Sequence, residues 1–89
     1  MNNTQVPLQE IETDNLSLAA FLTCSSCNLK EIKASSIPGK YLFVFYPDKK
    51  ISTLESDFFS FKALIVPQTY YSAIRDVKRQ LAEFKNRGR

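Results

Sequence analysis

The stretch YLFVFY, residues 41–46, carries the clearest strand signal in the chain. All but one of its positions are aromatic or β-branched, which favours a pleated strand. Because side chains alternate along a strand, both of its faces are apolar. One face must pack on helices. The other face is either covered as well or open, and aromatic side chains on an open face stack on nucleic-acid bases in RNA-recognition sheets.

The residues before this stretch predict the other half of a β-hairpin. Ile37-Pro38-Gly39-Lys40 has proline and glycine at the central positions of a type II turn. The preceding segment, residues 29–36, is moderately typical of a strand. We therefore expect residues 29–36 and 41–46 to pair as antiparallel neighbours.

Upstream of the hairpin, the sequence predicts a helix over residues 15–23 that ends near residues 25–26. Its apolar residues recur at helical spacing. Thr13 or Asp14 is the expected N-cap, and Asn28 is the expected left-handed residue at the other end.

Downstream of the hairpin, Ser52-Thr53-Leu54-Glu55 matches a capping box and predicts a short helix ending near Ser60. Residues 62–66, KALIV, form a short apolar run that we interpret as a third strand. Pro67 suits the first position of a final helix. That helix has an apolar stripe with alternating spacings of four and three residues, made by Tyr70, Ile74, Val77, Leu81 and Phe84.

These elements predict an α+β fold, because three helices alternate with strands that can form one antiparallel sheet. The expected order is helix, β-hairpin, helix, short strand and long C-terminal helix, with the sheet packed on the helices. A chain of 89 residues has room for a single small domain, which we place at residues 13–87. Residues 1–12, interrupted by Pro7, are expected to form a flexible or edge N-terminal arm.

The residue types that support most catalysis are missing. The chain has no histidine, the commonest general base, and its two glycines cannot make a glycine-rich phosphate loop. Cys24 and Cys27 are its only cysteines, whereas a structural zinc site needs four ligands. We interpret the pair as small, partly buried side chains, with a metal shared across a dimer or a redox pair as alternatives. We expect no enzyme activity, no catalytic residues, no metal and no cofactor.

The C-terminal end is basic and carries more positive charge than the chain as a whole, whose net charge is +3. Such an end attracts phosphate groups, although it is also common on solvated helix faces. The candidate phosphate-binding residues are Arg75, Lys78, Arg79, Lys85 and Arg87. The candidate base-stacking residues are Tyr41, Tyr46 and Tyr71.

Three segments together resemble a known family: residues 13–22, with DNLSLAAFL after Thr13, residues 41–45, and residues 66–78, VPQTYYSAIRDVK. Their order is similar to that of an uncharacterised family of small bacterial and phage α+β proteins, a domain of unknown function (five-six-five-nine). The resemblance implies the same fold and an origin in phages or mobile elements, and it supplies no activity. Within its pattern the positions of Tyr70, Arg75 and Lys78 are of interest.

The sequence therefore predicts a small non-enzymatic nucleic-acid-binding accessory module, with DNA or RNA as partner. The alternative is a protein–protein interaction adaptor or a homodimerising regulatory subunit that binds no nucleic acid. The first residues lack the basic and apolar regions of a signal peptide, and no apolar run is long enough to span a bilayer. We therefore expect a cytoplasmic protein without a membrane partner.

Overall fold

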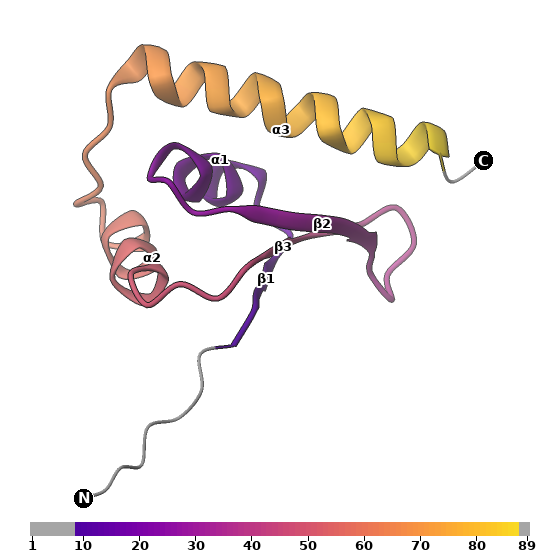
Figure 1. Ribbon diagram of the computed structural model, residues 1–89, viewed down its shortest axis with the longest axis horizontal. Helices are drawn as coiled ribbons and strands as arrows, with labels where there is room; N and C mark the ends of the chain where they lie inside the picture. Colours follow the sequence, from indigo (N-terminus) through magenta and orange to yellow (C-terminus); the bar gives the residue numbers. More distant parts are fainter. Residues whose placement is uncertain (1–8, 88–89) are drawn as a thin grey trace, which may run out of the picture.

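The computed structural model describes residues 9–87, and Figure 1 shows their arrangement. They form a three-stranded antiparallel sheet and three helices, so the predicted α+β class is confirmed. The strands are β1 (Ile11–Thr13), β2 (Leu29–Ala34) and β3 (Tyr41–Phe45). The helices are α1 (Leu16–Cys24), α2 (Ile51–Phe59) and α3 (Pro67–Arg87).

The apolar strand β3 lies at the centre of the sheet, whose strand order is β1-β3-β2. The predicted hairpin of β2 and β3 is present, with Ile32 opposite Phe43. Its turn has the expected type II features. Gly39 adopts a left-handed φ of 82°, and the Lys40 N–H donates to the carbonyl oxygen of Ile37 at 3.1 Å.

The predicted third strand at residues 62–66 is wrong, because this segment belongs to no strand. The third strand is β1, which pairs with the free edge of β3 and places Ile11 opposite Phe45. The last two residues of the predicted N-terminal arm, Ile11 and Glu12, therefore belong to an edge strand. The rest of that arm, residues 1–8, lies outside the described residues.

The ends of α1 differ from the prediction by one or two residues. Its N-cap is Asn15, whose side chain accepts a hydrogen bond from the Leu18 N–H at 3.0 Å. Thr13 supports this cap, because its hydroxyl accepts from the Asn15 N–H at 3.1 Å. At the other end the left-handed residue is Ser26, with φ 71°, rather than Asn28.

Helix α2 begins without the predicted capping box. It starts at Ile51, one residue before Ser52, and its N-cap Lys50 makes no side-chain capping bond. Asp48 supports this start instead, because its carboxylate accepts from the Lys50 N–H at 3.0 Å and pairs with the Lys50 ammonium. Ile51 is completely buried, so burial of this first residue fixes where the helix begins.

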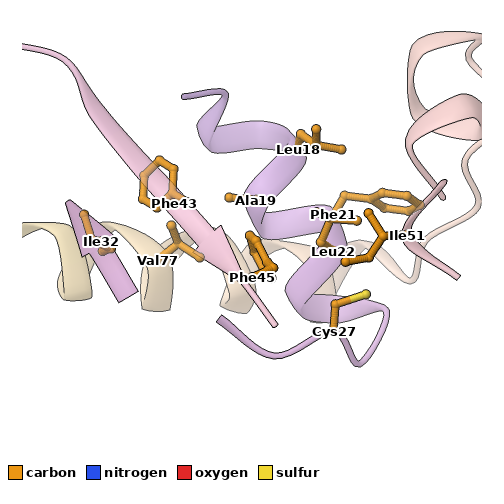
Figure 2. Close-up of a cluster of buried hydrophobic side chains, with 10 residues drawn as sticks. All are labelled: Leu18, Ala19, Phe21, Leu22, Cys27, Ile32, Phe43, Phe45, Ile51 and Val77. Atoms are coloured by element: carbon orange, nitrogen blue, oxygen red, sulfur yellow. The ribbon is translucent and has the colours of Figure 1, made fainter. Parts of the chain in front are cut away.

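The hydrophobic core lies between one face of the sheet and the helices, as Figure 2 shows. Phe43 and Phe45 of β3 meet Leu18 and Leu22 of α1, and Val77 joins them from α3. Helix α1 is buried at five consecutive positions, residues 18–22, because its surfaces meet the sheet, α2 and α3. Within residues 9–87, no helix combines the length and the apolar character that a membrane span requires.

Candidate functional site

Three lysines from two elements line one groove beside α3. Lys78 and Lys85 lie two turns apart on α3, and Lys40 comes from the turn between β2 and β3. The groove measures about 380 Å³, and its apolar floor includes Leu81 and Phe43. None of the three lysines takes part in an ion pair within residues 9–87. We call Lys40, Lys78 and Lys85 the lysine flank.

Two further residues shape this groove. Tyr41 lines it, and the Lys85 ammonium lies 5.1 Å from the centre of the Tyr41 ring. Asp14 also lines it, just before α1, and contributes one negative charge. The lysine flank therefore presents three cations against one carboxylate, so the groove as a whole attracts anions.

The arginines of α3 lie outside the groove. Arg79 reaches Asp76 at 3.6 Å and Glu83 at 3.4 Å, so two carboxylates offset its charge. Arg87 lines a different cavity, between α3 and β2, together with Lys30 and Glu83. The five predicted phosphate contacts are thus divided among separate surfaces of one helix.

At the start of α3, Tyr71 and Arg75 line a shallow hollow of about 450 Å³. Tyr71 is 64% exposed, and Arg75 is exposed and makes no ion pair among the described residues. Arg75 lies one turn before Lys78, so it extends the lysine flank toward the beginning of the helix. The neighbouring Tyr70 is structural, because its hydroxyl donates to the Ser17 carbonyl oxygen at 3.1 Å.

The three predicted stacking tyrosines are not brought together. The Tyr41 ring is half-buried and meets Phe84 edge to face, with ring centres 5.9 Å apart. Tyr46 follows β3, and its N–H donates to the Asn28 carbonyl oxygen at 3.0 Å. Tyr71 lies at the far end of α3 from the Tyr41 contact.

The outer face of the sheet, opposite the core, is covered by charged side chains. Val44 is only 1% exposed, and Glu12 and Glu31 lie on either side of it in the register. The Lys33 ammonium reaches the Glu12 carboxylate at 2.7 Å, so this ion pair spans β3 from one edge strand to the other. The pKa of Lys33 is raised mainly by this bond. The outer face therefore presents carboxylates and lysines beside its apolar residues, and Tyr46, just after β3, is half exposed.

The two cysteines occupy structural positions. Cys27 is 3% exposed, packs with the core, and donates its N–H to the Leu22 carbonyl oxygen at 2.9 Å. Cys24 is half-buried at the end of α1. Burial raises the pKa of both thiols, with the Asp48 carboxylate adding to the effect on Cys27. Among residues 9–87, no three His, Cys, Asp or Glu side chains converge on a possible metal position.

Sequence reasoning found two members of the lysine flank and missed the third. Lys78 and Lys85 stand out because they are seven residues apart on a helix. Lys40 gave no such signal, since it belongs to a turn whose position against α3 depends on how the hairpin packs. A pattern read along one element cannot find such a residue.

Comparison with known proteins identifies the family and nothing more specific. No characterised protein and no solved structure shows a significant match to the chain. Residues 8–83 match the family described as Domain of unknown function (DUF5659). This match covers β1 through most of α3, including the Tyr70, Arg75 and Lys78 positions. The chain therefore belongs to the DUF5659 family.

Proposed function

We propose that this protein is a small non-enzymatic nucleic-acid-binding module that contacts the phosphate backbone through the lysine flank. One observation carries the proposal. Lys40, Lys78 and Lys85 converge on a single groove, and no carboxylate within residues 9–87 forms an ion pair with them. Exposed ammonium groups without ion-pair partners are the groups that displace counterions from nucleic-acid phosphates.

The spacing of the lysines suits a phosphate chain. Lys78 and Lys85 are two helical turns apart, which corresponds to about 10 Å along the axis. One strand of DNA presents a phosphate about every 3.4 Å of helix axis, so this distance covers roughly three phosphates. Lys40 faces the same groove from the hairpin turn, and Arg75 adds a cation one turn before Lys78.

The surroundings favour contacts to the backbone over contacts to bases. The Tyr41 ring already packs against Phe84 and Lys85, so a base would have to displace these neighbours. Backbone contacts position a protein on nucleic acid without reading its sequence. We therefore propose binding with little sequence preference, in an accessory role in the cytoplasm and in a phage or mobile-element setting.

The test is a charge reversal of the lysine flank, with Lys40→Glu, Lys78→Glu and Lys85→Glu combined. Labelled DNA and RNA, single- and double-stranded, would be titrated at several salt concentrations. We expect wild-type affinity for duplex DNA to fall with salt at a logarithmic slope of about −2.7, as three phosphate contacts predict. The triple variant should lose at least tenfold in affinity and most of this slope.

The matched control reverses three exposed cations outside the groove, Lys49→Glu, Lys62→Glu and Arg87→Glu, none of which makes an ion pair among residues 9–87. This control has the same net charge as the triple variant. It should bind more tightly than the triple variant. Equal loss in both would mean that binding follows total charge, and the lysine flank would have no special role.

The alternative function makes the opposite prediction. An adaptor or homodimerising subunit without nucleic-acid binding would show no complex with any probe, even at low salt. That result would overturn the proposal and leave the lysine flank as a solvated face.

A further inference from the structure

The last residue of α2 and the connection that follows it expose several large apolar side chains within residues 59–66. Phe61 is 95% exposed and Leu64 is 92% exposed, and their neighbours Phe59, Ile65 and Val66 are also exposed. We call these five residues the apolar connection. Exposed apolar residues are common singly, but five large ones within eight residues are typical of an interaction surface.

Phe61 also has an unfavourable backbone conformation. It follows the end of α2 with a left-handed φ of 63°. The Lys62 N–H donates to the Asp57 carbonyl oxygen at 2.8 Å, and the Phe61 N–H donates to that of Phe58 at 3.3 Å. These two bonds define a helix ending in which glycine is the preferred residue. Phenylalanine is strained there and gains no burial within the chain, so its side chain has no stabilising role in the single molecule.

The backbone beyond Phe61 has unused hydrogen-bonding groups. Within residues 9–87, the N–H groups of residues 63–66 donate no hydrogen bond. The sequence of this segment, ALIV, nevertheless has the β-branched composition of a strand. Such a segment offers a free edge to which another strand can pair.

We propose that two copies of this chain associate through the apolar connection, by antiparallel pairing of residues 62–66 about a twofold axis. Twofold pairing of identical segments satisfies the same N–H and C=O groups in both copies. Because side chains alternate along a paired strand, it also places Leu64 beside the Leu64 of the other copy on one face and Ile65 on the opposite face. Leu64, and Phe61 just before the paired segment, would then lose part of the exposure that the single chain leaves them.

The available area is sufficient for such a dimer. Taking about 150–250 Å² for a fully exposed aromatic side chain and somewhat less for an aliphatic one, the apolar connection offers roughly 600 Å² per chain. Complete burial of these side chains in both copies would amount to about 1,200 Å² in total, which reaches the lower limit for specific interfaces. Pairing of the backbone adds hydrogen bonds to this apolar contact.

The charges near the apolar connection favour a second copy over nucleic acid or an anionic membrane. The segment contains one cation, Lys62, and the adjoining helix α2 carries Glu55 and Asp57. These carboxylates repel phosphate groups, whereas they attract the Lys62 of a neighbouring copy. Figure 1 places the connection at the start of α3, away from the C-terminal half that carries Lys85, so a dimer leaves the lysine flank open.

Sedimentation analysis over a wide concentration range, at high salt and without nucleic acid, tests the proposal. The mass should rise from the 10.2 kDa of one chain toward twice that value. Phe61→Gly and Leu64→Ser should each weaken association at least tenfold. Phe61→Gly should also raise the urea midpoint measured at a concentration where the wild type is monomeric, because it relieves the left-handed strain.

Two matched controls separate assembly from local effects. Ser26→Gly relieves the same kind of backbone strain at the end of α1, and Ile37→Ser removes an exposed apolar side chain from the hairpin turn. Both should dimerise like the wild type. As a direct probe of pairing, Leu64→Cys should form a disulfide-linked dimer under mild oxidation, whereas Ile37→Cys should not.

A wild-type protein that stays monomeric at its highest attainable concentration would overturn the proposal. So would a monomer that floats with phosphatidylcholine vesicles through Phe61, because the apolar connection would then contact lipid. Association that Phe61→Gly and Leu64→Ser leave unchanged would place the interface elsewhere. None of these results depends on nucleic-acid binding, so failure here and failure of the proposed function are distinguishable.

Discussion

Ser26 and Phe61 are the two residues other than glycine with left-handed φ values, among those that the structure describes. Each follows a helix and lets the last turn close with the same pair of backbone hydrogen bonds. They differ in the burial of the residues that follow them. Ser26 is followed by Cys27, which packs into the core beside Leu22, whereas Phe61 is followed by exposed residues. The first ending is therefore explained by the fold of one chain, and the second is not.

Ser26→Gly should stabilise the protein, because glycine adopts a left-handed conformation without the steric penalty that serine carries. We expect a gain of about 0.5–1 kcal/mol, after allowing for the larger entropy of glycine in the unfolded chain. The measurement is the urea midpoint in equilibrium unfolding. Ser36→Gly, in the exposed hairpin turn, is the control for the entropy effect and should not stabilise. A loss of stability in Ser26→Gly would mean that the serine makes a contact which the strain argument overlooks.

Burial should make the two thiols react at different rates. Cys24 is half-buried and Cys27 is buried in the core, and both have raised pKa values. Because only the thiolate attacks, alkylation near neutral pH should be slow for both and faster for Cys24. The rate at Cys24 should rise with pH until the raised pKa is passed. Mass spectrometry of partly alkylated protein measures both sites, and a fast reaction at Cys27 would contradict its place in the core.

Residue-scale prediction failed where several neighbours have the same chemistry. Thr13, Asp14 and Asn15 are all good N-cap residues, so composition alone did not choose among them. In the structure β1 holds Thr13 in the sheet opposite Phe43, where its hydroxyl accepts from the Asn15 N–H, and the Asn15 side chain accepts from the Leu18 N–H. Pairing between distant segments thus sets a boundary that local sequence leaves open.

At the scale of elements, the same cap gives a measurable prediction. Asn15→Ala removes the acceptor for the Leu18 N–H and should lower the free energy of unfolding by about 1 kcal/mol. Asp14→Ala is the control, since Asp14 is exposed and does not cap the helix. Urea unfolding compares the two. A larger loss in Asp14→Ala would mean that the carboxylate acts on α1 through its charge, and that the cap matters less than the geometry suggests.

The hairpin and the long final helix were predictable from sequence, and the edge strand was not. β3 has an aromatic and β-branched composition, α3 has a strong helical periodicity, and the turn between β2 and β3 contains the Pro-Gly pair that its geometry requires. Residues 62–66 have a better strand composition than Ile11–Thr13, yet β1 takes the free edge of β3. Position decides this outcome, because β1 leads directly into α1 beside the sheet. The unpaired strand-like segment is the one that we propose for association.

The candidate site was predictable only in part, because some of its contacts join residues of different elements. A helical wheel of α3 identifies its basic residues, but it does not show that Asp76 and Glu83 offset the charge of Arg79. Nor does it show that the hairpin turn brings Lys40 to the side of α3 that carries Lys78. Interactions within an element can be read from spacing, whereas those between elements need the fold.

At the scale of the whole molecule, the core is small and shared by every helix. Phe21 of α1 and Phe58 of α2 have ring centres 5.7 Å apart, and Val77 joins α3 to the cluster around Phe45. A chain of this length buries a modest fraction of its surface, so its stability margin is narrow. We therefore expect the sheet and the helices to unfold together, in one transition.

Val77→Ala tests whether the sheet and the helices unfold cooperatively. Val77 is completely buried, and its truncation removes apolar contacts and leaves a small cavity, at a cost of about 2 kcal/mol. Far-ultraviolet circular dichroism and tyrosine fluorescence should report the same lowered urea midpoint, because α3 cannot separate while the rest stays folded. Arg75→Ala, at an exposed position of the same helix, should change the midpoint little. Two separate transitions in Val77→Ala would show that α3 docks independently on a domain formed by the sheet, α1 and α2. The lysine flank would then be lost at lower denaturant than the fold itself, since Lys78 and Lys85 keep their places beside Lys40 only while α3 is docked.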